Sequence, residues 1–175
     1  MLNFLYPKIY VDGLLDIPLD QLREQNIKAF IIDLDNTITE WNSSELRAEI
    51  ETWFTLLKED GFKACILSNN GERRIKVVAD RLGIPFIHRA AKPRRGSFHR
   101  AVEILGVKPS ETAVVGDQVF TDILGGNRAG LFTILVKPLA RREFVGTKIN
   151  RTLELIVLRH LFKKQIIKGD AQDEN

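Results

Sequence analysis

The sequence has few of the features that mark secreted, disulfide-bonded or membrane-spanning proteins. It contains one cysteine, Cys65, so no disulfide can form within the chain, which suits a reducing compartment. No apolar stretch approaches the roughly 20 residues that a bilayer-spanning helix needs. The first residues, MLNFLYPKIYVDG, have neither the basic region nor the cleavage site of a signal peptide. We therefore expect a cytoplasmic protein, either soluble or peripheral on the inner face of the membrane, with no transmembrane segment.

The net charge is also small, +3 over 175 residues, but the basic residues gather in two stretches. Residues 88–100 hold five Lys or Arg, two His and no acid, and residues 141–168 hold eight Lys or Arg against two Glu. Basic surface of this kind favours an anionic partner, which can be a phosphate group, an anionic lipid surface or a nucleic acid. The chain length fits one domain over residues 1–175, with a core at about 28–137.

Short apolar runs alternate with segments at helical spacing. The runs predict buried strands at residues 29–32, 64–67, 84–87, 112–115 and 132–136. The helical stripes predict one helix opened by an Asn42/Glu45 capping pair, and two more that end at Gly83 and Gly106. A basic amphipathic helix is expected at about 147–168, before a polar tail at 169–175 that should fray. This alternation predicts an α/β fold: a doubly wound parallel sheet in a three-layer α/β/α arrangement.

Polar side chains follow four of the predicted strands. In open parallel sheets the active site lies at the carboxyl ends of the strands, so these side chains should meet at one edge. In chain order they are Asp33, Asp35 and Thr37, then Ser68 and Asn69, then Lys92, and last Asp117 and Asp122.

This set of residues suits phosphoryl transfer. Several acidic side chains at one edge repel each other unless a cation lies among them, and oxygen ligands beside a substrate phosphate favour Mg²⁺. A carboxylate can attack phosphorus, a second carboxyl group can protonate the leaving oxygen, and a hydroxyl and an ammonium can bind the equatorial oxygens. The sequence therefore predicts a Mg²⁺-dependent phosphohydrolase.

The quartet DLDNT, SNN, AKP and GDQVFTD, in this order, resembles the four motifs of the haloacid dehalogenase phosphatase superfamily. The resemblance implies that Asp33 is the nucleophile and Asp35 the general acid/base. It implies Mg²⁺ ligands at Asp33, Asp35 (through its backbone carbonyl) and Asp117, with Asp122 in a supporting role. The phosphoryl group would be bound by Thr37, Ser68, Asn69 and Lys92.

The spacing of the motifs leaves no room for a cap domain, because predicted helices already fill the segments between Thr37 and Ser68 and between Ser68 and Lys92. The capless pattern and the entry segment YPKIYVDGLLDIPLDQLREQNIKAFIIDLDNTI are similar to subclass IIIA members, the phosphatidylglycerophosphate phosphatases and their bacterial relatives. That resemblance implies a phosphate monoester on an anionic lipid as substrate, and a protein that works at a membrane surface.

Other interpretations of these residues remain open. Ser68 could cap a helix, Lys92 could be a solvated loop residue, and Arg94/Arg95 could be either a helix start or a head-group clamp. The C-terminal helix could pack on the sheet instead of a membrane. The substrate could be a nucleotide, a sugar phosphate or a phosphoprotein, and the chain could be a non-catalytic module that binds phosphate or nucleic acid, although nucleic acid is the less favoured partner.

Overall fold

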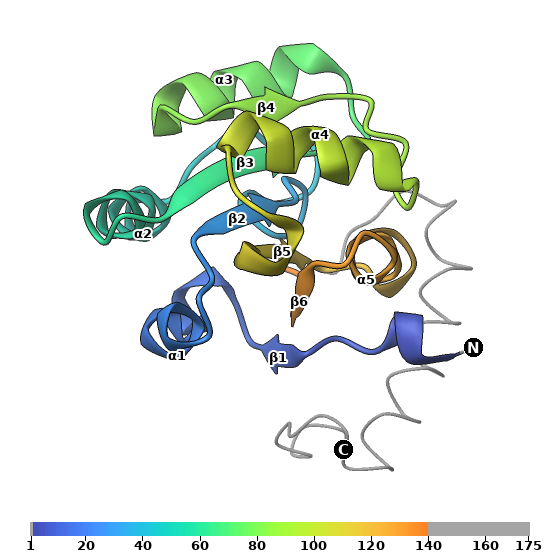
Figure 1. Ribbon diagram of the computed structural model, residues 1–175. Helices are drawn as coiled ribbons and strands as arrows, with labels where there is room; N and C mark the ends of the chain where they lie inside the picture. The colour runs from blue at the N-terminus through green and yellow to red at the C-terminus, as the bar shows by residue number, and fades with distance from the viewer. Residues whose placement is uncertain (1, 140–175) are drawn as a thin grey trace, which may run out of the picture.

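The computed structural model of the protein describes residues 2–139, and six strands in this part form one parallel sheet (Figure 1). The order across the sheet is β1-β6-β5-β2-β3-β4. The strands are β1 Ile9–Val11, β2 Ala29–Ile32, β3 Lys63–Leu67, β4 Phe86–Ile87, β5 Thr112–Gly116 and β6 Phe132–Val136. All five predicted strands are present, and β1 is an additional edge strand that pairs with β6.

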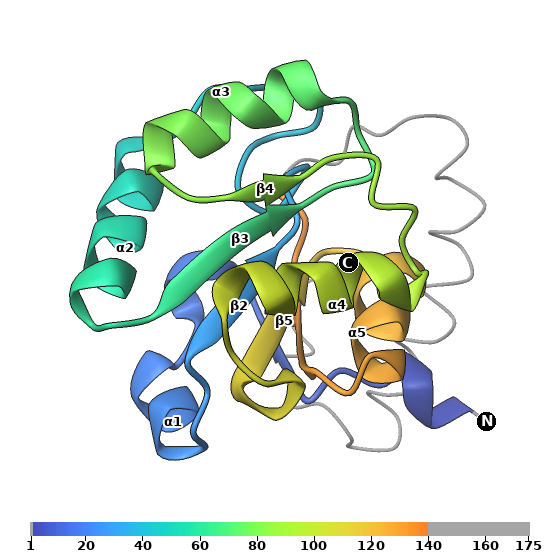
Figure 2. The ribbon, with the colours of Figure 1, turned by 45° about the horizontal axis from the view of Figure 1, so that its top comes forward.

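The helices cover both faces of the sheet (Figure 2). One face carries α1 Leu19–Glu24, α2 Ala48–Glu59 and α3 Glu72–Leu82, and the other carries α4 Arg95–Leu105 and α5 Leu124–Arg128. Alternate residues of β2 enter the two cores, Phe30 and Ile32 on the first face and Ala29 and Ile31 on the second. The predicted doubly wound, three-layer α/β fold is therefore confirmed.

The register of the central strands brings their carboxyl ends level. Ile32 at the end of β2 lies opposite Val115 of β5 and Ile66 of β3. The backbone N–H of Asp33, the next residue, still donates to the carbonyl of Val115 at 2.9 Å. The segments that follow these three strands therefore begin at the same edge of the sheet, as the sequence predicted.

Two of the predicted helix ends are confirmed, and one predicted helix start is wrong. Gly83 and Gly106 follow α3 and α4 in the left-handed conformation that a C-cap often requires. The Asn42/Glu45 pair does not cap α2, which begins at Ala48. The backbone N–H of Asn42 instead donates to Asp35 Oδ1 at 3.0 Å, and that of Glu45 donates to the Ser43 hydroxyl at 3.0 Å. Residues 40–47 therefore form a loop beside the end of β2.

Close packing of α5 on the sheet gives a testable prediction at Gly126. A Cβ there would overlap the Val114 side chain and lie 2.9 Å from the Thr133 methyl group. Gly126→Ala should lower the free energy of unfolding by about 1–3 kcal/mol, as overpacking does. Chemical denaturation measures this, with Gly96→Ala in α4 as the control. A Cβ at Gly96 meets open space, so that variant should be as stable as wild type or more so by about 0.5–1 kcal/mol.

Several features expected from the sequence lie outside the described residues. They include the basic amphipathic helix at about 147–168 and the tail at 169–175. Within residues 2–139, no helix is long and apolar enough to cross a membrane. Cys65 lies buried in β3, and burial raises the pKa of its thiol to about 12, which agrees with its expected place in the core.

Candidate active site

A pocket of about 170 Å³ opens at the carboxyl edge of the sheet. Asp33 follows β2, Ser68 follows β3, and Asp117 follows β5. Lys92 reaches the same place from the loop between β4 and α4. The predicted residues that line the pocket are Asp33, Asp35, Ser68, Asn69 and Lys92. Four separate segments of the chain thus deliver polar side chains to one small volume.

The ammonium group of Lys92 lies between two buried carboxylates. Its Nζ is 2.8 Å from Asp33 Oδ1 and 2.6 Å from Asp122 Oδ1. The Lys92 side chain is only 3% exposed. Burial by itself lowers the pKa of Lys92, but the charges of Asp122 and Asp33 outweigh it and hold that pKa above its usual value. The two carboxylates therefore hold the Lys92 ammonium in place within the pocket lining.

Three buried acids lie close enough together to hold one metal ion. A carboxylate oxygen of each of Asp33, Asp117 and Asp122 lies within 4.8 Å of the others. Burial raises the pKa of Asp33 to about 7, even though Lys92 acts to lower it. Lys92 contacts two of these three acids, Asp33 and Asp122. Because the donors are all hard oxygens, the cluster fits a divalent cation of the Mg²⁺ kind.

Local packing and hydrogen bonds position Asp122. The Gln118 backbone N–H and the Thr121 hydroxyl each donate to Asp122 Oδ2 at 3.3 Å. These residues lie in or beside a π-helical turn, Val119–Ile123, that follows β5. A Cβ at Gly116 would overlap the Asp122 carboxyl group, so the glycine allows this close approach. The sequence predicted a supporting role for Asp122, and the structure places its carboxylate within the acidic cluster itself.

The carboxylate of Asp35 lies in a different set of contacts. The Arg74 guanidinium donates to both of its oxygens, at 2.6 Å to Oδ1 and 2.7 Å to Oδ2. The Asn70 side-chain amide also donates to Oδ2, and the Asn42 backbone N–H donates to Oδ1. Asp35 is thus held by two segments, the loop at residues 40–47 and the start of α3.

The remaining predicted phosphate-binding residues have distinct places. Asn69 fixes the backbone of Lys92, whose N–H donates to Asn69 Oδ1 at 2.8 Å. Ser68 is 1% exposed at the end of β3, and its hydroxyl accepts from the Asn70 backbone N–H at 3.3 Å. Gly71, not Ser68, directly precedes α3. Thr37 is buried beside Asn36, and its hydroxyl has no hydrogen-bond partner within residues 2–139.

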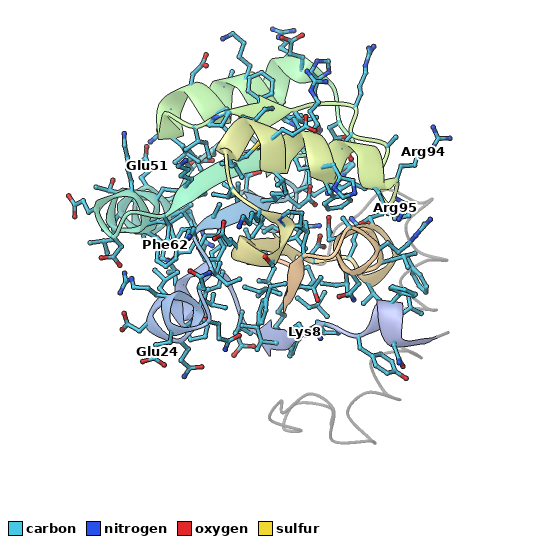
Figure 3. The ribbon with its side chains drawn as sticks, in the orientation of Figure 1. Lys8, Glu24, Glu51, Phe62, Arg94 and Arg95 are labelled. Carbon is cyan, nitrogen blue, oxygen red and sulfur yellow. The ribbon has the colours of Figure 1, made fainter. Side chains whose placement is uncertain are left out.

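The sequence interpretation missed several residues of the pocket, and it left the Arg94/Arg95 pair open. The missed lining residues are Asn36, Trp41, Asn70, Gln118 and Thr121, and Arg74, which contacts Asp35, was missed as well. Asn70 and Arg74 closely follow Ser68, so their positions after the second strand were the available signal. Arg94 and Arg95 lie at the start of α4 and extend away from the sheet (Figure 3). The pair thus forms an exposed helix start outside the pocket lining.

Described residues 37–92 contain no cap domain between the strand ends. Only the loop at 40–47, α2 and β3 separate Thr37 from Ser68, and only α3 and β4 lie between Ser68 and Lys92. An uncapped pocket with buried acids and a buried lysine at the carboxyl edge of a parallel sheet suits an enzyme that hydrolyses phosphate esters.

The chain belongs to the haloacid dehalogenase-like hydrolase family, whose sequence model matches residues 40–130. It is 43% identical over 168 residues to a protein of Bacillus subtilis named probable phosphatase YqeG, covering 96% of this chain and 98% of that one. It is 30% identical to phosphatidylglycerophosphate phosphatase 1 of Arabidopsis thaliana, covering 93% of this chain and 49% of that one. The protein is accordingly a phosphatase, and the chain spans about half the length of the plant relative.

Solved structures confirm the fold. An uncharacterized protein from Listeria monocytogenes superposes with a TM-score of 0.54 at 20% identity, covering 76% of this chain and 99% of that one. The cobalt-bound deoxy-D-mannose-octulosonate 8-phosphate phosphatase of Haemophilus influenzae superposes with a TM-score of 0.53 at 15% identity, covering 77% of this chain and 89% of that one. Similarities at this level of identity extend to the architecture alone.

Proposed function

We propose that the protein is a Mg²⁺-dependent phosphomonoesterase in which Asp33 is the nucleophile. The observation that carries the proposal is the buried contact of Lys92 with both Asp33 and Asp122 beside Asp117. A lysine in this place holds the Asp33 carboxylate in one orientation at the floor of the pocket. Such fixed geometry is what nucleophilic attack on phosphorus requires.

The proposed reaction has two steps, and Asp35 gives up a proton in the first and takes one from water in the second. An oxygen of Asp33 attacks phosphorus, the bond to the leaving oxygen breaks, and Asp35 gives that oxygen a proton. Water then attacks the aspartyl phosphate, Asp35 takes a proton from the water, and release of phosphate restores the Asp33 carboxylate. Ser68 and Lys92 bind phosphoryl oxygens as charge develops on them.

The metal site of the proposal uses residues that the fold brings together. Asp33, Asp117 and the backbone carbonyl of Asp35 would hold Mg²⁺, with Asp122 supporting them. When bound, the ion supplies positive charge that offsets the phosphoryl group and the buried acids. The acidic cluster supports this assignment, because a carboxylate oxygen of each of its three buried acids lies within 4.8 Å of the others.

The proposed substrate is phosphatidylglycerophosphate, dephosphorylated at the inner face of the membrane by a peripheral cytoplasmic enzyme. Two relatives support this substrate by their names, the Arabidopsis protein and a phosphatidylglycerophosphatase of Saccharomyces cerevisiae that is 29% identical over 146 residues. The uncapped pocket also supports it, because a large substrate anchored in a membrane needs an open site. The basic stretches at 88–100 and 141–168 would favour an anionic surface.

A substrate comparison tests the proposal. Purified protein is mixed with vesicles that contain phosphatidylglycerophosphate, or with a panel of nucleotides, sugar phosphates and phosphopeptides, and released phosphate is measured with Mg²⁺ or with EDTA. We expect the lipid to be cleaved fastest and EDTA to abolish the activity. Faster cleavage of a soluble ester would reject the lipid assignment and keep the mechanism, whereas full activity in EDTA would reject the metal.

A further inference from the structure

The residues around Asp35 define where the leaving group lies. Under the proposed function, on which this inference rests, Asp35 gives its proton to the leaving oxygen. The departing alcohol must therefore lie against the groups that surround Asp35, while the phosphoryl group lies against Ser68 and Lys92. Those surrounding groups are Trp41 and Asn70, which line the pocket, and Arg74, which contacts Asp35 directly.

Arg74 holds its guanidinium against the Asp35 carboxylate. It lies in the first turns of α3, an 11-residue helix, and its side chain is 20% exposed. Nη1 donates to Asp35 Oδ1 at 2.6 Å and to the Ser43 carbonyl at 3.0 Å, while Nη2 donates to Asp35 Oδ2 at 2.7 Å. The Asp35 and Ser43 contacts thus hold the guanidinium from two sides.

One edge of the guanidinium is left over. Within residues 2–139, the bonds to Asp35 and Ser43 use both hydrogens of Nη1 and one of Nη2. The hydrogen of Nε and the second hydrogen of Nη2 lie along one edge of the planar group. That edge matches the spacing of two oxygens in a phosphate or carboxylate. A guanidinium held by one carboxylate can therefore bind a second anion side-on.

We infer that Arg74 is a specificity-determining residue that binds a second anionic group within the leaving alcohol. The preferred substrates are then phosphomonoesters whose leaving group carries an anion such as a phosphodiester, a few ångströms from the cleaved bond. Trp41, which lines the pocket and is 40% exposed, offers an apolar surface for the carbon chain that joins the two phosphates.

A pair of soluble substrates isolates this effect from membrane binding. Glycerol 3-phosphate carries only the phosphomonoester, whereas deacylated phosphatidylglycerophosphate, glycerophosphoglycerophosphate, carries the same phosphomonoester and one phosphodiester. The measured quantity is the ratio of their kcat/KM values. We expect wild type to prefer the diester compound by about tenfold or more, the size of effect that a charge-assisted pair supports.

Arg74→Gln should bring this ratio close to one. Arg74→Lys, which keeps the charge but loses the planar fork, should give an intermediate ratio. Arg73→Gln is the matched control, because it removes the same charge from the neighbouring residue, which is exposed. Arg73→Gln should therefore leave the ratio of the two kcat/KM values at its wild-type level. Circular dichroism and thermal melts establish that each variant is folded. If Arg74→Gln does not fold, the ratio measured for Arg74→Lys is used to test the inference.

The outcomes separate this inference from the proposed function. A wild-type ratio near one, or a ratio that Arg74→Gln leaves unchanged while both rates fall equally, would show that Arg74 only supports the structure, and would overturn the inference. An equal loss of the ratio in Arg73→Gln would overturn it too, in favour of a general charge effect. If wild type hydrolyses neither compound nor any other phosphomonoester, the proposed function fails and the inference fails with it.

Discussion

Asp33→Asn should release phosphate on the order of 10⁴-fold more slowly than wild type, because the amide has the shape of the carboxylate but cannot act as the nucleophile. The rate is measured with saturating substrate and Mg²⁺. The fold should survive the change, since Lys92 keeps its 2.6 Å contact with Asp122. Acid quenching during turnover should trap phosphate on the wild-type chain and none on the variant.

Asp12→Asn provides the matched control for this experiment. Asp12 follows β1 at the same edge of the sheet, but it is exposed and lies outside the pocket lining. Its substitution removes one carboxylate charge near that edge and should leave the rate unchanged. A residual rate in Asp33→Asn above about a tenth of wild type would contradict the nucleophile assignment, because a rate effect of that size fits a supporting residue.

Lys92→Met should lower the free energy of unfolding by about 3–5 kcal/mol in EDTA, because it leaves buried carboxylates without their cation. Lys92 is 3% exposed, and its partners Asp33 and Asp122 are 6% and 1% exposed. Mg²⁺ should recover part of the lost stability, because an ion that binds only the native state stabilises it. Denaturant titrations with Mg²⁺ and with EDTA measure both effects.

A surface ion pair supplies the control for Lys92. Lys28 Nζ lies 2.6 Å from Glu111 Oε1, the same distance as between Lys92 and Asp122, but the Lys28 side chain is 53% exposed. Lys28→Met should cost less free energy of unfolding than Lys92→Met, because water screens the exposed Lys28 ammonium even though the Glu111 side chain is 13% exposed. Equal losses of unfolding free energy in the two variants would contradict the prediction, because they would show that burial does not make the Lys92 ion pairs more important for stability. Adding Asp122→Asn to Lys92→Met should recover stability, since it removes one of the unpaired charges.

The central strands were predictable because burial on both faces requires continuous apolar runs. Residues 29–32 and 112–115 show such runs, and both lie in the middle of the sheet. The edge strand β1 has three residues of intermediate burial, and its partner β6 lies more than a hundred residues away in the chain. Nothing local distinguishes such a segment from a loop, so its strand conformation is visible only once β6 is in place.

The start of α2 shows how a tertiary contact overrides a local signal. The Asn42/Glu45 spacing is typical of a capping box, and the apolar stripe after it is helical. Asp35, however, accepts the Asn42 backbone N–H, so that group is used by a residue seven positions earlier in the chain. Residues 40–47 therefore form a non-helical loop beside the pocket, and the helix begins at Ala48.

The fold class, the capless spacing and the gathering of Asp33, Ser68, Lys92 and Asp117 at one edge could be predicted from the chain alone, because parallel strands of known order place their carboxyl ends together. The partners of each side chain could be identified only in the folded structure. It paired Lys92 with Asp122 and Asp35 with Arg74, 30 and 39 residues apart in the chain. Such pairs depend on the register of the strands and on the placement of helices and loops over the pocket. A local sequence pattern does not contain this information.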